Sequence, residues 1–298
     1  MGNGLLPRSA SGDDSADTAV EEELARLRLL LRAYGLRPNK RLGQNFLLQA
    51  GALRKVVDAA ALSGNEAVLE IGAGAGSLTL MLARNAARVV AVEVDERLRP
   101  LLADVLRPYP NVRLVFGDIL RQNVAELMQN EPYAVVANIP YYITSAVIRH
   151  LMTAERRPER LVLTVQREVA QRMTAEPPRM NLLALSVQVF GEPKVVARLP
   201  AGAFFPPPKV DSAVVRVDVF PEPLVPAEQL DLFFRLARAG FSQRRKQLRN
   251  SLAAGLGMKP ARAAELLSAA GIDPSRRAES LSIENWRTLA EKFSAWNG

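Results

Sequence analysis

The feature that most constrains the fold is an alternation of short β-branched runs with helical stretches, which begins near Ala67. The apolar runs are Val68–Ile71, Arg88–Val94, Val112–Phe116, Tyr133–Ala137 and Leu161–Gln166. Helical patterns at Leu78–Arg84 and Arg97–Leu106 separate the first three of them. Buried β-branched strands that alternate with helices are typical of a parallel sheet covered on both faces. The sequence therefore predicts an α/β fold.

The pattern changes on both sides of this block. Helices are expected at Glu21–Tyr34 and near Gln49–Ala61, where leucine and alanine recur at helical spacing. Leu185–Phe190 and Ala213–Val219 are expected to be strands at an antiparallel edge of the sheet. Pro221–Pro226 is a linker by composition, and the chain beyond it is predicted to be helical. We therefore expect a disordered tail at 1–20, a Rossmann-like domain at 21–220 and a separate helical domain at 221–298.

The residue types that are missing narrow the chemistry. The chain has no cysteine and only one histidine, His150, which lies in an apolar stretch. Disulfides, thiolate nucleophiles and multi-histidine metal sites are therefore excluded, and we expect no metal. No apolar run reaches the ~18 residues of a membrane span, and Met1–Asp17 lacks the apolar core of a secretory signal. We expect a cytoplasmic protein that does not contact a membrane.

A formal net charge of +8, carried mostly by arginine, fits a partner rich in phosphate. Net charge that serves only solubility fits the composition equally well. Charge alone therefore leaves the partner open.

A glycine cluster follows the first strand of the alternating block. Gly72, Gly74 and Gly76 stand between Val68–Ile71 and the next helix, where glycine permits a tight turn and a close approach to a ligand. Glu93 ends the second strand, where a carboxylate can hold the hydroxyls of a ribose. These features fit two classes of cofactor, a dinucleotide and S-adenosylmethionine.

Two further positions favour S-adenosylmethionine. The dinucleotide fingerprint requires a glycine where this chain has Ser77, and the spacing G-x-G-x-G resembles the first motif of class I methyltransferases. Asp118 and Ile119 follow the third strand, where an aspartate can accept a hydrogen from the adenine amino group of the cofactor. A plain helix N-cap would explain Asp118 alone equally well.

The segment Asn138-Ile139-Pro140-Tyr141 follows the fourth strand and indicates the methyl acceptor. An exocyclic adenine nitrogen is a poor nucleophile because its lone pair is delocalised into the ring. The Asn138 side-chain oxygen and the Ile139 or Pro140 carbonyl can accept both amino hydrogens, while Tyr141 stacks on the base for ~1–3 kcal/mol. A turn of the Asn-x-Pro type without catalytic function is the alternative.

Asn138–Tyr141 is similar to the (D/N/S)-x-P-(Y/F) motif of amino methyltransferases. With Lys40–Leu47, Phe204–Ser212 and Phe241–Lys246 in this order, the chain resembles the KsgA family of rRNA adenine dimethyltransferases from about Tyr34 to its C-terminus. The resemblance implies a class I S-adenosylmethionine-dependent methyltransferase fold with a mostly parallel seven-stranded sheet and a small all-α C-terminal domain. It also implies transfer of methyl groups to the N6 atoms of two adjacent adenines in the 3′-terminal stem-loop of 16S rRNA within an immature small ribosomal subunit.

The resemblance assigns roles to individual residues. The cofactor-binding set is Asn45, Leu47, Gly72, Gly74, Glu93, Asp118, Ile119 and Asn138. The target base is expected to meet Asn138, Pro140 and Tyr141 on one side and Phe204 on the other. One departure affects substrate positioning: Asn181–Ser186 stands where the family has a Tyr-Gly-x-Leu-Ser segment.

Base flipping is required, because a stacked adenine cannot reach a buried methyl donor. Two basic groups are predicted to grip RNA phosphates, the second of them on one helix face: Arg37, Lys40 and Arg41, and Arg244, Arg245, Lys246 and Arg249. Solvated helix faces are the ordinary explanation for any single one of these arginines. We expect the protein to act as a monomer.

Three alternative functions remain. A related enzyme type methylates large-subunit rRNA and confers macrolide resistance, and the extended helix expected at Phe241–Lys246 argues against it. A non-catalytic RNA-binding factor could retain the fold, but the glycine cluster and Asn138–Tyr141 are intact. A dehydrogenase fits least, because Ser77 breaks its fingerprint.

Overall fold

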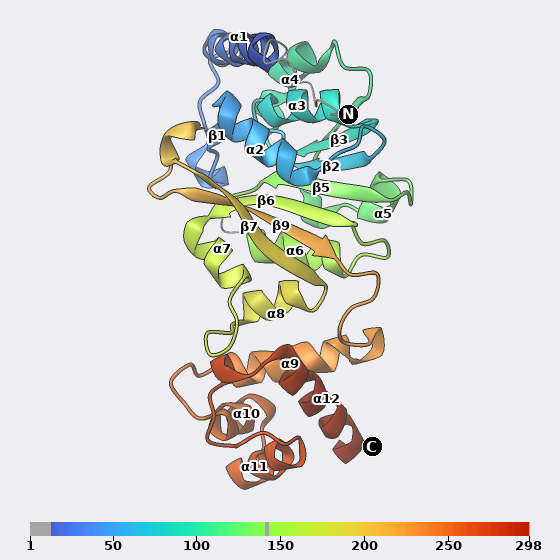
Figure 1. Ribbon diagram of the computed structural model, residues 1–298, viewed down its shortest axis with the longest axis vertical. Coiled ribbons are helices and arrows are strands. Elements are labelled where there is room, and N and C mark those ends of the chain that lie inside the picture. The colour runs from blue at the N-terminus through green and yellow to red at the C-terminus, as the bar shows by residue number, and fades with distance from the viewer. Residues whose placement is uncertain (1–12, 141–142, 298) are drawn as a thin grey trace, which may run out of the picture.

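A computed structural model describes residues 13–140 and 143–297. A seven-stranded sheet crosses the upper part of the molecule in the order β4-β3-β2-β5-β6-β9-β7 (Figure 1). Its strands are β2 (Ala67–Ile71), β3 (Arg88–Glu93), β4 (Val112–Phe116), β5 (Tyr133–Asn138), β6 (Arg160–Gln166), β7 (Gly191–Leu199) and β9 (Ser212–Val219). The strands from β4 to β6 pair in parallel, whereas β9 is antiparallel to both β6 and β7. The predicted mostly parallel sheet is confirmed.

A separate two-stranded sheet joins two segments that are far apart in sequence. It consists of β1 (Phe46–Leu47) and β8 (Phe204–Phe205), with Phe46 opposite Phe205 and Leu47 opposite Phe204. The N-terminal segment is thereby fixed against the loop that follows β7.

Helices cover both faces of the large sheet. One face is covered by α2 (Ala50–Ala60), α3 (Ser77–Asn85) and α4 (Arg99–Leu106), and α1 (Asp13–Ala33) packs against α2 and α4. The other face packs against α5 (Val124–Leu127), α6 (Thr144–Met152), α7 (Arg167–Met173) and α8 (Leu182–Gln188). Away from their ends, the central strands are apolar on both sides except at the buried Glu70 of β2 and Thr164 of β6, as a doubly covered sheet favours.

The strand predicted at Leu185–Phe190 is wrong, because these residues belong to α8 and the turn that follows it. Asn181 caps this helix: its Oδ1 accepts the Leu183 and Ala184 N–H groups, both at 3.1 Å. A short apolar run has no decisive periodicity, and the cap decides in favour of helix. The antiparallel edge strand is β7, in which only the terminal residues Gly191 and Leu199 are buried, so the sequence shows no alternating apolar pattern there.

The C-terminal helices form the lower part of the molecule (Figure 1). They are α9 (Leu230–Phe241), α10 (Leu248–Leu256), α11 (Pro260–Ala269) and α12 (Ile283–Asn297). Their core centres on the fully buried Trp286, and the Phe241 ring stacks on it at 5.6 Å. Phe234 of α9 stacks on Phe190 below the sheet at 6.3 Å, so one apolar core runs through both parts.

The N-terminal helix begins earlier than expected. α1 starts at Asp13, so the part of the predicted tail from 13 to 20 is helical, and Val20 is already buried. The remainder of that tail, residues 1–12, lies outside the described residues. Among the described helices, none is both long and apolar enough to cross a membrane.

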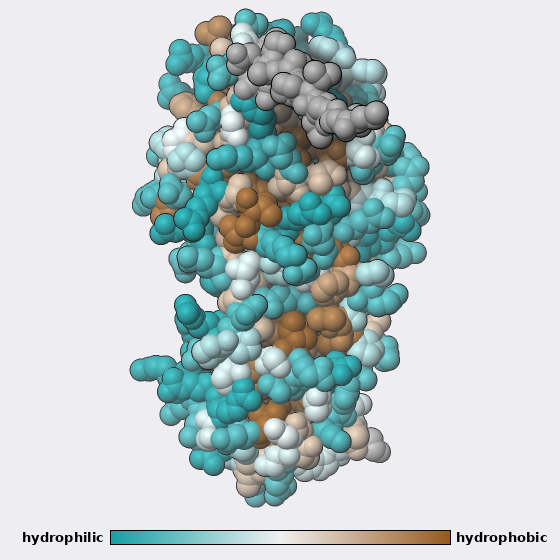
Figure 2. Space-filling view, viewed as in Figure 1, coloured by the Kyte–Doolittle hydropathy of each residue, from teal (hydrophilic) through white to brown (hydrophobic). Residues whose placement is uncertain are grey.

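The face seen in Figure 2 is mostly hydrophilic, with separate apolar patches. It is hollowed on one side between the sheet and the C-terminal helices (Figure 2). The molecule thus presents a concave surface between its two parts.

Candidate active site

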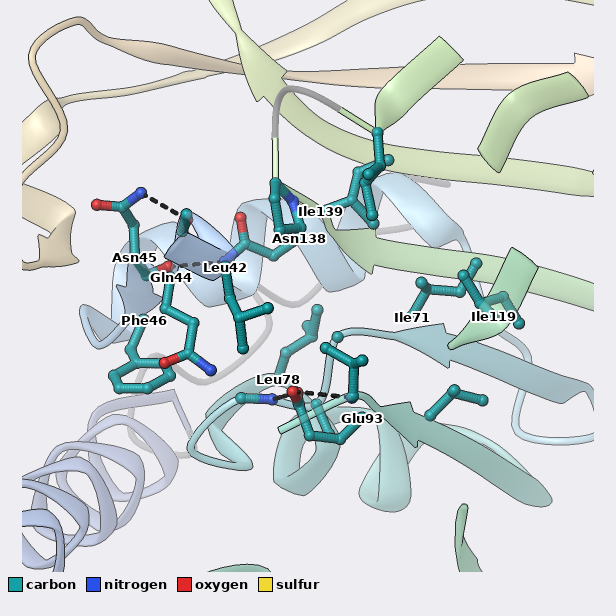
Figure 3. Close-up of a pocket in the computed structure, with 18 of the residues that line it drawn as sticks. Leu42, Gln44, Asn45, Phe46, Ile71, Leu78, Glu93, Ile119, Asn138 and Ile139 are labelled. Atoms are coloured by element: carbon teal, nitrogen blue, oxygen red, sulfur yellow. Dashed lines mark hydrogen bonds between the residues drawn. The ribbon is translucent and has the colours of Figure 1, made fainter. Parts of the chain in front are cut away.

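A cavity of about 330 Å³ lies at the carboxyl ends of the parallel strands β2, β3 and β5. Figure 3 shows Glu93 and Leu78 below it, Asn138 and Ile139 above it, and the segment from Leu42 to Phe46 closing one side. This is where open α/β sheets bind their ligands. All residues of the predicted cofactor set line the cavity: Asn45, Leu47, Gly72, Gly74, Glu93, Asp118, Ile119 and Asn138.

The glycine loop forms the floor of the cavity through conformations that side chains oppose. Gly72, Gly74 and Gly76 have φ angles of 84°, 56° and 88°. A Cβ on Gly74 would lie 3.1 Å from the Phe46 ring, and one on Gly72 would lie 3.4 Å from the Asn138 carbonyl oxygen. Any larger residue would therefore be strained and would narrow the cavity.

Ser77 has a structural function that was not evident from the sequence. Its hydroxyl donates to the Leu47 carbonyl at 2.6 Å, so the first residue of α3 is joined to the N-terminal segment. A third glycine at this position could not make that bond. Ser77 therefore helps to close the cavity.

Glu93 places a carboxylate at the rim of the glycine loop. Its Oε2 accepts the Gly74 N–H at 2.7 Å, and its Oε1 accepts the N–H groups of Val94 at 3.0 Å and Asp95 at 2.9 Å. The side chain is 4% exposed, and this burial raises the pKa of the carboxyl above its ordinary value. The backbone donors partly offset that rise and fix the carboxylate in position.

Asp118 makes the predicted helix cap, and the structure also places it at the cavity. Its Oδ1 caps the short helix Ile119–Arg121 by accepting the Leu120 N–H at 3.0 Å, and its side chain also lines the cavity. Ile119 is buried beside it and, in Figure 3, lies near Ile71. One carboxylate oxygen therefore holds the loop, and the other lies 3.9 Å from Nε of the exposed Arg121.

The N-terminal segment is held over the cavity by hydrogen bonds. Gln44 accepts the Asn39 N–H at 2.7 Å and donates to Asp95 Oδ2 at 2.9 Å. Asp95 is bound in turn by the Arg97 guanidinium at 2.6 Å, which lowers the pKa of that carboxyl. The sequence analysis assigned no function to Gln44 or Asp95. The position of Asp95, two residues after Glu93, was the one sequence signal for this hydrogen-bond network.

The acceptor loop begins at Asn138, whose amide orientation is set by the same segment. Asn138 Nδ2 donates to the Asn45 carbonyl at 3.1 Å, which leaves Oδ1 as the acceptor for a substrate. The Pro140 carbonyl already accepts the Ile143 N–H at 3.2 Å. Across the described residues, no backbone donor bonds the Ile139 carbonyl. Of the two carbonyls considered, that of Ile139 is therefore the available one.

The other residues predicted to meet the base lie in different surroundings. Pro140 lines the cavity, whereas Tyr141 lies outside the described residues. Phe204 is 4% exposed and packs in the core, not at the cavity wall, and the exposed aromatic ring of this pair is Phe205. The base contact of Phe204 stays a prediction that requires this ring to leave its packing.

The predicted RNA-binding residues are all exposed, in two separate places. Arg37 follows α1, and Lys40 and Arg41 form a short 3-10 helix before the cavity-closing segment. The expectation that the second basic group shares one helix face is wrong: α9 ends at Phe241, and the turn before α10 carries three of the four residues: Arg244, Arg245 and Lys246. Only Arg249 is helical, in the first turns of α10.

A buried carboxyl lies directly behind the glycine loop. Glu70 of β2 is completely buried, and burial raises its pKa to about 8. The buried Thr79 hydroxyl and the nearby Glu93 charge act on this pKa in opposite directions and are secondary to burial. Neither Glu70 oxygen has a hydrogen-bond partner among the described residues. Glu70 is therefore protonated at neutral pH.

The match to a known family spans nearly the whole chain. A family model described as ribosomal RNA adenine dimethylase matches residues 35–295. The chain belongs to the ribosomal RNA adenine dimethylase family. This confirms the predicted enzyme class, an rRNA adenine dimethyltransferase, and S-adenosylmethionine as its cofactor.

Two curated relatives carry the description ribosomal RNA small subunit methyltransferase A. That of Dehalococcoides mccartyi is 46% identical over 275 residues, which cover 92% of this chain and 94% of the relative. That of Staphylococcus aureus is 41% identical over 290 residues, which cover 94% of this chain and 96% of the relative. The similarity therefore includes the C-terminal helices as well as the sheet.

Among solved structures, 23S rRNA methyltransferase ErmE is similar with a TM-score of 0.66 and 30% identity over 84% of this chain and all of that chain. A dimethyladenosine transferase from Plasmodium falciparum has a TM-score of 0.69 and 24% identity over 85% of this chain and 98% of that chain. The second likeness concerns the fold alone, and both confirm the predicted class I methyltransferase architecture.

The residues present fit the cofactor of the family. The glycine loop leaves a cradle that a Cβ would fill, and the Glu93 carboxylate stands at its edge. Val94 and Leu120 add apolar surface beside Asp118, which suits a flat base with one polar edge. These positions fit the predicted contacts of Glu93 with the ribose and of Asp118 with the adenine amino group, which stay predictions.

Proposed function

We propose that this protein transfers methyl groups from S-adenosylmethionine to the N6 atoms of two adjacent adenines in the 3′-terminal stem-loop of 16S rRNA, within an immature small ribosomal subunit. The observation that carries the proposal is the acceptor loop at the cavity, where Asn138 Nδ2 donates to the Asn45 carbonyl and Oδ1 accepts no hydrogen bond from the residues that the structure describes. The similarity to small-subunit methyltransferases over 92% of the chain supports the choice of RNA.

The chemistry requires a lone pair on an otherwise conjugated nitrogen. The bound cofactor supplies an electrophilic methyl group. Asn138 Oδ1 and the Ile139 carbonyl accept the two amino hydrogens, which draws electron density toward N6 and directs its lone pair into the cavity. Because the methylated nitrogen loses its proton readily, the site needs no strong base. Pro140 limits the motion of this loop, so the acceptors are positioned before the substrate arrives.

The residues around the cofactor hold it in one orientation. Glu93 accepts the ribose hydroxyls, Asp118 accepts the adenine amino group, and Gly72 and Gly74 admit the backbone close to the ligand. Asn45 and Leu47 close the cavity through their bonds to Asn138 and Ser77. The closing segment therefore links cofactor binding to the orientation of the catalytic amide.

Tyr141 and Phe204 are proposed to hold the flipped adenine between them. The basic residues Arg37, Lys40, Arg41, Arg244, Arg245, Lys246 and Arg249 are proposed to contact phosphates. The hollow between the two parts of the molecule, seen in Figure 2, gives a curved surface for structured RNA. We also propose that the protein works as a cytoplasmic monomer, and light scattering that shows a stable dimer would overturn this part.

Methylation of large-subunit rRNA is the second candidate, favoured by the 30% identity to 23S rRNA methyltransferase ErmE. Transfer of labelled methyl groups to immature small-subunit particles and, separately, to protein-free 23S rRNA distinguishes the two. We expect dimethyladenine in the small-subunit RNA alone. Label confined to 23S rRNA would overturn the proposal in favour of the second candidate.

A further inference from the structure

A second pocket lies outside the cofactor cavity and involves none of the residues that line it. The C-terminal end of α1, the following loop and β8 enclose it, and its walls include Arg28, Leu31, Arg32, Leu36, Arg37 and Phe205. In Figure 1 the segment that descends from α1 passes beside the loop that carries β8. The pocket is therefore formed by parts of the chain that are distant in sequence.

The charge of this pocket is entirely positive. Three arginines line it, and no acidic side chain does. Arg28 donates to the Leu48 carbonyl at 2.5 Å, which joins α1 to the segment after β1. Arg32 and Arg37 are exposed, and within the described part of the chain neither pairs with a carboxylate. Arg84, Arg88 and Arg97, by contrast, are all neutralised by acidic neighbours.

The apolar part of the pocket is an exposed aromatic ring. Phe205 is 51% exposed, whereas the preceding Phe204 is buried, as alternation along a strand requires. An exposed phenylalanine beside free guanidinium groups offers a stacking surface for a base and charge for its phosphate. A peptide bound in this pocket would need acidic side chains to neutralise the three arginines, whereas a nucleotide carries its negative charge on the phosphate.

The position of the pocket relates it to the catalytic cavity. Phe205 lies directly opposite Phe46 in the two-stranded sheet, and Phe46 lines the cofactor cavity. One pair of short strands therefore carries an aromatic residue for each pocket. This two-stranded sheet thus lies between the two pockets.

We infer that this pocket binds the unpaired nucleotide next to the target adenine, with its base stacked on Phe205 and its phosphate held by Arg32 and Arg37. The inference rests on the proposed function, since a substrate with two adjacent adenines must place one of them outside the cavity while the other reacts. The pocket would thus set the register of the RNA strand for each transfer.

The test compares Phe205→Ala with Phe205→Trp, which keeps a stacking ring, and with Leu224→Ala, which truncates another exposed apolar side chain. Kinetics are measured with immature small-subunit particles, and cofactor affinity is measured directly. We expect Phe205→Ala to raise KM by about 5-fold to 100-fold, the range of one base stack, with kcat and cofactor affinity unchanged. Phe205→Trp should restore KM, and Leu224→Ala should match the wild type. A KM for Phe205→Ala equal to that of Leu224→Ala would overturn the inference.

A second measurement separates RNA from a protein partner. Binding to protein-free 16S rRNA as a function of salt should weaken in Phe205→Ala, and Arg32→Ala and Arg37→Ala should each reduce the salt slope by about 0.7. An effect seen with particles but not with protein-free RNA would overturn the inference, because the pocket would then contact a ribosomal protein. If the wild type transfers no methyl group to particles, the proposed function is wrong. The binding measurements with protein-free RNA then still show whether this pocket binds RNA.

Discussion

The cofactor cavity and the basic segments differ in what holds their side chains in place. Around the cavity, Glu93 is fixed by three backbone N–H groups and Asn138 by the Asn45 carbonyl, all at the ends of buried strands. Arg244, Arg245 and Lys246 stand on an exposed turn. The cavity is therefore preorganised, whereas the basic side chains of this turn are free to adapt to the RNA that we propose they contact. Substitutions at the cavity should therefore have larger effects than substitutions on the basic surface.

The largest effect is expected at Glu70, behind the cavity floor. Because its pKa is raised to about 8 by burial, the folded protein holds this proton more tightly than the unfolded chain. The free energy of unfolding therefore falls as pH rises from the ordinary carboxyl range toward 8. The decline is at most about 1.4 kcal/mol for each pH unit in that window.

Glu70→Gln removes the titrating group while it keeps the shape. Chemical denaturation between pH 5 and pH 8 should show a smaller decline in the variant than in the wild type. Equal declines in the two proteins would show that Glu70 does not titrate in this range.

Glu93→Gln is expected to weaken cofactor binding by about 10-fold to 100-fold, since hydrogen bonds to a charged acceptor contribute about 1.5–3 kcal/mol. Because burial raises the pKa of Glu93, wild-type affinity should also fall on acidification earlier than an ordinary carboxylate would require. Calorimetric titration of S-adenosylmethionine checks both effects, with Glu96→Gln as an exposed control on the next segment. A pH profile that is the same in wild type and Glu93→Gln would contradict this assignment.

Gln44→Ala tests whether the closing segment orients the catalytic amide. Loss of the bond to Asp95 should lower kcat by about fivefold, because one hydrogen bond contributes about 1 kcal/mol and the segment that carries the Asn45 carbonyl is then held less firmly. Cofactor affinity should change less than kcat. Gln44→Glu is not a suitable conservative variant, because its carboxylate would repel that of Asp95. Gln44→Asn keeps the amide on a shorter side chain and tests whether the length of Gln44 is needed to contact Asp95. If Gln44→Ala reduced only cofactor affinity, the link to Asn138 would be wrong.

Single substitutions in the exposed turn are expected to have the smallest effects. Arg244→Ala and Arg245→Ala should each weaken rRNA binding a few-fold and lower the salt slope by about 0.9 if the phosphate belongs to a duplex. Arg287→Ala, on α12 and paired with Glu284 at 2.7 Å, is the matched control and should leave the slope unchanged. Slopes that are equal in all three variants would remove this turn from the RNA interface.

The cavity was predictable from sequence because its residues follow strand ends. Parallel strands bring their carboxyl ends to one edge, so Gly72, Glu93, Asp118 and Asn138 meet once the strands are recognised. The functions of Gln44 and Asp95 were not predictable in this way, because their contact depends on how a distant loop folds over that edge.

The errors lie where local and tertiary effects compete. Leu185–Phe190 is not a strand because Asn181 caps a helix there, and the expected helix at Phe241–Lys246 ends at its first residue. Gly240 packs against both Trp286 and Leu248 in the C-terminal core, and this packing favours a turn between α9 and α10. A basic run with helical propensity gives no sign of such a constraint.

The most direct test of the proposed role of the Asn138 side-chain amide is the variant Asn138→Ala. Its rate of methyl transfer to immature small-subunit particles is measured together with its affinity for the cofactor. We expect a loss in kcat on the order of a hundredfold or more, because an acceptor that acts in the transition state is removed. Cofactor binding should be reduced far less. Transfer at the wild-type rate would contradict the proposal that the Asn138 amide, held by Asn45, activates the adenine nitrogen.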